Sequence, residues 1–247
     1  MGRRVNDHAR RYGFLLGVLA GLGVGAIGAL ALLLGSPQDS GPALARNWSP
    51  WEPGTTRMVD GAEEIAGHVG LRYKLDSGDQ LVSIRSSPLE GEELGVAVRP
   101  SGGRLQFLEG EGLLYVLSGF GPNGTIPHGT ASKERGRLLL REALELALYS
   151  FRYLDDVTMV AVRLPQTPEP AAGQTRVVFY RPGDLLAQLQ VPLAETLSPK
   201  TPTPATMTPI EAGRVDDLTL RNLFLASVQE LEAEQNYLVL VEPDTIE

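Results

Sequence analysis

The sequence predicts an α+β fold: an N-terminal transmembrane helix followed by an extracytoplasmic antiparallel or mixed sheet packed by two main helices. Three observations predict it. They are an uncharged apolar run near the N-terminus, short β-rich segments separated by turn residues, and two long amphipathic segments. The chain has 247 residues, which suffices for an anchor and one large or two small folded units. Apolar residues make up 43% and charged residues 21%, as in ordinary globular proteins.

The apolar run covers residues 13–35, which are 23 positions without Asp, Glu, Lys or Arg. A helix of this length spans about 34 Å, more than the hydrocarbon core of about 30 Å. Lipid cannot satisfy backbone N–H and C=O groups, so the segment must be helical. A cleaved signal peptide, with a cleavage site near Ala45, is the alternative, but its apolar region is typically only about 7–15 residues.

Charge predicts the orientation of this helix. Residues 1–12 hold four arginines against Asp7, a net charge of +3. The positive-inside bias therefore predicts a cytoplasmic tip over 1–12 and a cell-membrane protein whose C-terminal part lies outside the cytoplasm. Of the net charge of −8, residues 36–247 carry −11. Such an acidic part without a basic tract disfavours nucleic acid as a partner.

A row of small residues follows one face of the predicted transmembrane helix. Gly13, Gly17, Gly21, Gly25 and Ala29 recur at every fourth position. Small residues at this spacing let a second helix approach closely. The row predicts self-association or packing against another envelope protein. The alternative is that glycine is simply common in membrane helices.

Composition divides the remainder of the chain. Residues 36–56 contain four prolines and are predicted to be a linker. Residues 57–197 are predicted to form the extracytoplasmic α+β domain. Residues 198–209 carry four prolines among threonines, which predicts a second, extended and exposed linker. Residues 210–247 are then a C-terminal helix–strand unit.

Five segments between Ile65 and Leu117 are rich in Val, Leu, Ile and aromatic residues and are separated by Gly, Pro, Asp and Ser. Apolar and polar residues alternate in several of them, which is typical of an antiparallel sheet with one wet face. The predicted strands are Val69–Leu75, Gln80–Arg85, Gly95–Arg99, Arg104–Leu108 and Leu113–Leu117.

The first main helix is predicted to begin after Ser132, a plausible N-cap with Glu134 in the first turn. Its apolar stripe is broad and extends to Leu154, which predicts deep burial. The second main helix is predicted over Asp216–Gln235. A short helix is predicted over Asp184–Leu189. Further strands are predicted at Val157–Leu164, Val177–Tyr180 and Tyr237–Val241.

One glycine pattern imitates a nucleotide-binding motif. Gly119, Gly121 and Gly124 match G-x-G-x-x-G after a predicted strand, but the chemistry requires a helix that opens at these glycines. Pro122 intervenes and the helix begins only near Ser132. The segment is therefore predicted to be a turn-rich loop, and no cofactor is predicted.

Catalytic and metal sites are not indicated. Cysteine is absent, and His8, His68 and His128 are the only histidines, of which His8 lies in the cytoplasmic tip. No G-x-S-x-G nucleophile elbow occurs. His128, beside a proline, is predicted to be solvated or turn-stabilising. Trp48 and Trp51 fit either the lipid interface or the edge of the domain.

Two functional hypotheses follow. The favoured one is a non-enzymatic, membrane-anchored protein of the bacterial envelope, with an extracytoplasmic interaction or assembly domain. The alternative is a membrane-tethered enzyme or small-ligand receptor. A concave pocket with converging polar groups favours the receptor or enzyme, whereas an apolar surface patch favours the interaction domain.

Overall fold

A computed structural model of the chain describes residues 48–89, 94–100, 103–166, 175–232 and 235–243. The predicted transmembrane helix, 13–35, and its row of Gly13, Gly17, Gly21, Gly25 and Ala29 lie outside these residues. None of the helices in the described part combines the length and the apolar character that a membrane span requires.

The described residues form an α+β fold around one mixed sheet of eight strands, in the order β1-β4-β5-β6-β7-β8-β2-β3. β4 and β5 are parallel, as are β2 and β8, and the other neighbours are antiparallel. The strands are β1 (Ser83–Leu89), β2 (Gly95–Arg99), β3 (Gln106–Leu108), β4 (Gly112–Ser118), β5 (Met159–Arg163), β6 (Thr175–Tyr180), β7 (Leu223–Glu232) and β8 (Gln235–Val241).

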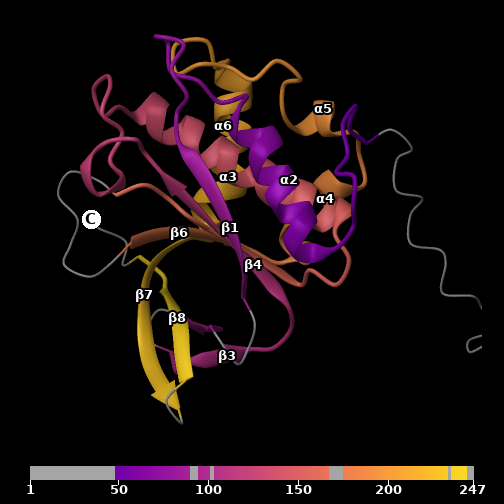
Figure 1. The fold of residues 1–247 in the computed structure, drawn as a ribbon, viewed down its shortest axis with the longest axis vertical. Helices are drawn as coiled ribbons and strands as arrows, with labels where there is room; N and C mark the ends of the chain where they lie inside the picture. Colours follow the sequence, from indigo (N-terminus) through magenta and orange to yellow (C-terminus); the bar gives the residue numbers. More distant parts are fainter. Residues whose placement is uncertain (1–47, 90–93, 101–102, 167–174, 233–234, 244–247) are drawn as a thin grey trace, which may run out of the picture. The chain divides into compact units, whose positions relative to one another are not determined.

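The helices gather on one side of this sheet, in the upper half of Figure 1, while β3, β7 and β8 form the lower end. They are α2 (Met58–Gly70), α3 (Lys133–Tyr153), α4 (Leu186–Leu189), α5 (Leu193–Thr196) and α6 (Pro209–Thr219). The α3 helix connects the parallel strands β4 and β5, which cannot be joined by a tight turn.

The α3 helix confirms the first predicted main helix. The Ser132 side chain accepts a hydrogen bond from the Arg135 backbone N–H, so the predicted N-cap is present. Every residue from 138 to 150 is buried, because α2 and α6 pack along the helix. The predicted deep burial is confirmed, and it extends to the side that carries Arg141 and Glu145.

The central strands β5 and β6 are buried on both faces. Val160 and Val178 point into the core beneath the helices. Their neighbours Met159 and Phe179 point the other way, into a second apolar cluster that also contains Leu238 of β8. Successive side chains of a strand point to opposite faces. The sheet therefore curls so that its β7-β8-β2 part packs onto the second face of β5 and β6.

The predicted strand Val69–Leu75 is wrong. Val69 belongs to the last turn of α2, whose buried residues include Ala62, Ile65 and Ala66. These four positions have the i, i+3, i+4, i+7 spacing of a helix face. The local content of branched apolar residues favours a strand, but the helical spacing of the buried residues decides the conformation.

The predicted second main helix, Asp216–Gln235, is also wrong. The helix α6 begins earlier, at Pro209, where the Thr208 side chain caps it. Residues from Leu223 onward form β7, which pairs with β6 and β8. Two neighbouring strands offer this segment more contacts than a solvated helix has, so the sheet overrides the local helical pattern.

Both predicted linkers have contacts with the fold where they are described. Trp48 is only 2% exposed, and its carbonyl accepts a hydrogen bond from the Leu193 N–H. Within 198–209, the Ser198 carbonyl and the Ala205 N–H bond to Arg141 and Asp76. The predicted domain boundaries stay predictions.

Candidate ligand-binding pocket

A cavity of about 470 Å³ lies where four distant segments meet. Its walls come from residues 48–51, from the end of α2, from α3, and from 192–199. Ligand pockets in proteins have about this size, and they combine apolar walls with a few polar groups.

Aromatic rings form one wall of the cavity. Trp51 and His68 stack face to face, with ring centroids 3.9 Å apart and an interplanar angle of 4°. Tyr149 meets both rings edge-on, and Trp48 packs edge-on against Tyr149 at 5.5 Å. Both tryptophans of the chain thus line this cavity, so of the two predicted locations they adopt the edge of the domain.

The segment that carries the tryptophans is fixed by polar contacts. The Trp48 indole N–H donates to the Gln188 carbonyl at 3.2 Å. The Ser49 and Tyr149 hydroxyls lie 2.7 Å apart in a buried hydrogen bond. Because tertiary partners hold both ends of the wall, the rings are preorganised rather than free to turn.

Arg72 forms the polar floor. Its Nη1 donates to the Glu145 Oε1 at 2.8 Å and lies 3.4 Å from the His68 Nε2. Its Nη2 donates to the Pro199 carbonyl at 3.2 Å. A side-chain hydrogen bond also joins Arg72 to Tyr149. The Arg72 side chain is 26% exposed, so it is open to the cavity.

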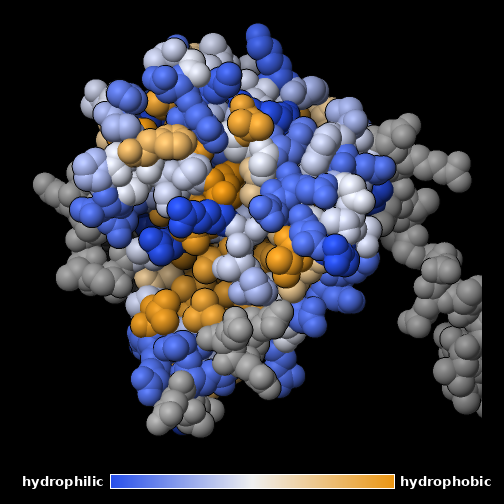
Figure 2. Space-filling view, in the orientation of Figure 1, coloured by the Kyte–Doolittle hydropathy of each residue, from blue (hydrophilic) through white to orange (hydrophobic). Residues whose placement is uncertain are grey.

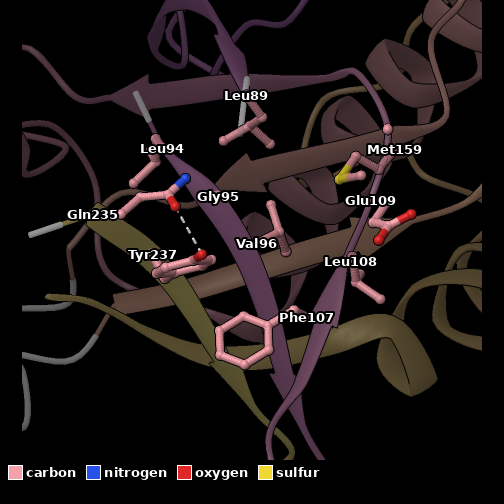
Figure 3. Close-up of a pocket in the computed structure, with 11 residues that line it drawn as sticks. Leu89, Leu94, Gly95, Val96, Phe107, Leu108, Glu109, Met159, Gln235 and Tyr237 are labelled. Atoms are coloured by element: carbon pink, nitrogen blue, oxygen red, sulfur yellow. Dashed lines mark hydrogen bonds between the residues drawn. The ribbon is translucent and has the colours of Figure 1, made fainter. Parts of the chain in front are cut away.

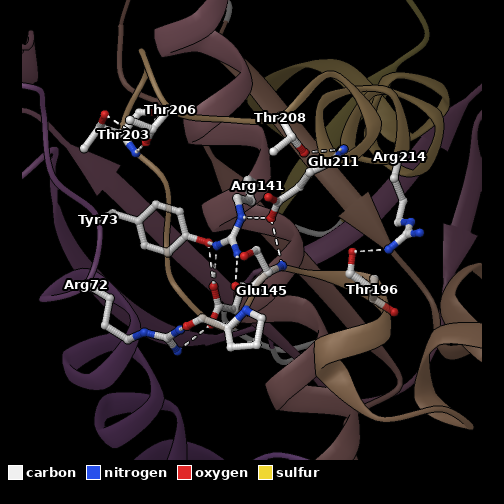
Figure 4. A network of polar contacts seen from close by, with 12 residues as sticks. Arg72, Tyr73, Arg141, Glu145, Thr196, Thr203, Thr206, Thr208, Glu211 and Arg214 are labelled. Atoms are coloured by element: carbon white, nitrogen blue, oxygen red, sulfur yellow. Dashed lines mark hydrogen bonds and ion pairs between the residues drawn. The ribbon is translucent and has the colours of Figure 1, made fainter.

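Behind Arg72, charges alternate into the protein (Figure 4). Glu145 also accepts from the Arg141 Nη1 at 3.0 Å, and the Arg141 Nε donates to the Glu211 Oε1 at 2.7 Å. The Tyr73 hydroxyl donates to the Glu145 Oε2 at 2.5 Å. Glu145 and Arg141 are 1% and 0% exposed. The hydrogen bonds of this network satisfy its buried charges, as such charges require.

The same network holds the chain that follows α5. The Arg141 Nη2 donates to the Ser198 carbonyl at 2.8 Å, and the Ser198 N–H donates to Glu211 at 2.9 Å. Together with the Arg72–Pro199 bond, these contacts fix the 192–199 wall of the pocket against α3.

Glu142 differs from its neighbours on α3. Its carboxyl group is buried, and neither oxygen has a hydrogen-bond partner among the described residues. Burial raises the pKa of Glu142 well above its usual range, and the nearby Glu145 raises it further. Glu142 therefore holds its proton more tightly than an exposed carboxyl group does.

His68 shows the opposite shift. Burial lowers the pKa of His68, and the adjacent Arg72 lowers it further, against a smaller opposing effect of Glu145. The neutral ring accepts from the Arg72 guanidinium through Nε2, which places its proton on Nδ1. Of the charged side chains that line the cavity, Arg72 is thus the exposed one.

A second hollow of about 450 Å³ lies at the other face of the sheet. Its lining is mostly apolar, with Leu89, Val96, Phe107 and Met159 around it (Figure 3). The Tyr237 hydroxyl donates to the Gln235 Oε1 at 2.9 Å near its rim. Figure 2 shows hydrophobic side chains gathered in a hollow between the helices and the β7–β8 end. Glu109 is the charged residue in the described lining of this apolar groove, and none of the ion pairs among the described residues involves it.

The sites considered from sequence lie elsewhere. The Gly119–Gly124 segment is a loop, which contains a short 3₁₀ turn at Pro122–Gly124, so the predicted turn is confirmed. His128 is exposed, and its carbonyl accepts from Arg135. In the described part of the chain, no three His, Asp or Glu side chains are grouped so as to hold a metal ion.

The residues of the pocket were not singled out as a site from the sequence. Two signals are present: a charged pair one turn apart, Arg141 and Glu145, within the broad apolar stripe of α3, and two tryptophans three positions apart before α2. Neither signal indicates that 192–199 completes the cavity.

Comparison of the chain with protein-family models, with characterised proteins and with solved structures finds no match.

Proposed function

We propose that the protein is a membrane-anchored receptor whose extracytoplasmic domain binds a small organic ligand in the cavity between Trp51, Arg72 and Leu197. The observation that carries the proposal is the convergence of an aromatic wall and a part-exposed guanidinium in a cavity of about 470 Å³. A purely structural charged network would not need its last member exposed to a hollow.

The anchor is part of this proposal. It rests on the uncharged run over residues 13–35 and on the arginines that precede it, which favour a cytoplasmic N-terminus. Protease added to sealed cells should degrade the chain downstream of residue 36. Full protection of residues 48–247, or a mature chain found free in the medium, would contradict the anchor or its orientation.

Ligand binding can be tested with the protein's own fluorescence. Both tryptophans of the chain line the cavity, so the emission of the full-length protein in nanodiscs, after subtraction of empty nanodiscs, reports on this site. A collection of small organic acids, amines, sugars and amino acids is screened for changes in emission, and hits are verified by thermal stabilisation. At least one compound should change both readouts.

Variants separate binding from indirect effects. Trp51→Leu should abolish the response of Trp48 to a hit, whereas the matched change Phe120→Leu, at a ring 58% exposed in another part of the fold, should leave it intact. If no compound in the screen alters emission or thermal stability, the receptor proposal fails.

The apolar groove favours a second candidate, an interaction or assembly domain without catalytic activity. Its support is the lining of Leu89, Val96 and Phe107 and the glycine row of the anchor. Crosslinking in membranes should detect self-association or a second envelope protein. An unchanged pattern after Gly17→Ile and Gly21→Ile would remove the glycine row from this proposal.

A further inference from the structure

The ion pairs beside the pocket form a series of alternating charge. Its members are Glu211, Arg141, Glu145 and Arg72, and the exposed fractions of these side chains are 9%, 0%, 1% and 26%. The two inner members are buried, and of the two ends of the series it is Arg72 that lines the cavity. A ligand that enters the cavity meets the positive end of the series.

The Arg72 guanidinium is oriented before any ligand arrives. The hydrogen bonds to Glu145 and to the Pro199 carbonyl fix its plane, and the neutral His68 ring receives a third contact. A guanidinium has five N–H donors, and the contacts to Glu145, Pro199, His68 and Tyr149 occupy at most four of them. A planar, preorganised guanidinium with a spare N–H recognises a carboxylate better than a flexible ammonium does.

The walls complete the description of the ligand. Trp51 and Tyr149 are aromatic, and Leu193, Leu197 and Pro192 supply apolar surface. Among the described residues, Glu145, 1% exposed, is the one acidic side chain that lines the cavity. Arg72 would pair with an anionic end of the ligand, and the walls would contact an apolar or ring-shaped body. A cationic end would instead face Arg72 without a partner of opposite charge.

We infer that the ligand of this pocket is a small organic carboxylate, whose acid group binds Arg72 and whose apolar body lies against Trp51, Tyr149 and the leucines of 193–197. This inference rests on the proposed receptor function and specifies the class of compound.

The test uses three compounds with one frame and different charge: 3-phenylpropionate, 3-phenylpropanamide and 3-phenylpropylammonium. Affinities for the full-length protein in nanodiscs are measured by calorimetry and by tryptophan emission. The carboxylate should bind at least tenfold more tightly than the amide, and the ammonium should bind most weakly. The affinity of the carboxylate should fall as the salt concentration is raised, because its charge contributes to binding.

Arg72→Gln should remove the preference for the carboxylate over the amide, and Arg72→Lys should restore part of it. Arg104→Gln, at an exposed arginine outside the pocket, is the matched control and should change nothing. The three compounds are also compared on the unmodified protein, so a folding defect of Arg72→Gln cannot obscure the result.

Each outcome is decisive. If the amide or the ammonium binds as tightly as the carboxylate, or if Arg72→Gln keeps the preference, the inference is wrong while the receptor proposal stands. Binding of none of the three also overturns the inference. Whether the cavity binds any compound is decided separately by the fluorescence screen.

Discussion

Two hollows of similar size, about 470 Å³ among the helices and about 450 Å³ at the sheet, differ in their charged residues: a network of buried ion pairs ends at the first, whereas the second has the exposed Glu109 in its described lining. The helix-side pocket lies at the end of a buried series of ion pairs, and the groove on the other face is lined by residues such as Leu89 and Met159. Burying ion pairs costs desolvation free energy that their attraction seldom exceeds. A fold retains such a series where it holds something in place, and here it holds Arg72 and the 192–199 wall.

The largest expected effect concerns the centre of the network. Glu145→Ala leaves Arg141, 0% exposed, without its partner one turn away, and loss of one member of a buried pair costs about 3–5 kcal/mol. Urea unfolding of the full-length protein in detergent, followed by tryptophan emission, measures the change. Glu63→Ala, at an exposed position of α2, should cost less than about 0.5 kcal/mol. Equal effects of the two changes would contradict the structural role of the network.

Glu142→Leu should have the opposite sign. It removes a buried carboxyl group without a partner, and such a group costs about 1–3 kcal/mol. Because burial raises the pKa of Glu142, the folded state keeps a proton that the unfolded state loses above about pH 4.5.

The contribution of Glu142 to stability is therefore complete below pH 4.5 and declines as pH rises toward the pKa of the folded state. Glu142→Leu should flatten the profile over this range and raise stability at neutral pH. The free energy of unfolding measured from pH 4.5 to pH 8 tests this. A variant with the same slope as the unmodified protein would show that Glu142 titrates normally.

On the groove side, close packing rather than charge should decide stability. A Cβ added at Gly95 would lie 2.5 Å from the Tyr237 ring, closer than atoms can approach. Gly95→Ala should cost about 1 kcal/mol, at the lower end for overpacked sites, because Tyr237 is only partly buried and can turn. In a Tyr237→Ala background the same change should cost much less, which a double-mutant cycle measures. Additive effects would contradict the contact.

His68→Gln should have the smallest effect. Burial and Arg72 lower the pKa of His68, so the unfolded state binds the proton first as pH falls below about 6.5. This stabilising contribution is present above pH 6.5 and is lost as pH falls toward the pKa of the folded state. The loss opposes the trend from Glu142, so it is measured best in the Glu142→Leu background. His68→Gln should abolish the remaining slope there, and a ring signal that titrates at 6.5 in spectra of labelled protein would argue against the shift.

Local sequence patterns predict an element correctly where its contacts in the fold favour the same conformation. The strand Gly95–Arg99 is β2 as predicted, and the helix after Ser132 has its N-cap and its burial. The helix predicted over Asp216–Gln235 is wrong from Leu223 onward, because pairing with the next strand, β8, and with β6, which is distant in the sequence, decides the conformation there. The pocket could not be predicted for the same reason. Its wall, floor and opposite side come from 48–51, 68–72, 145–149 and 192–199, and no local pattern reports that these segments meet.

The hydrogen bond between Trp48 and Gln188 joins residues 140 positions apart. A ribosome adding about 5–20 residues per second needs roughly 7–28 s to supply the second partner after the first. Trp51 can meet His68 early, but during that interval the Trp48 indole N–H has yet to reach its acceptor. A chaperone that shields the nascent chain should therefore bind the segment around Trp48. It should release this segment only once the region around Pro199 has left the exit tunnel.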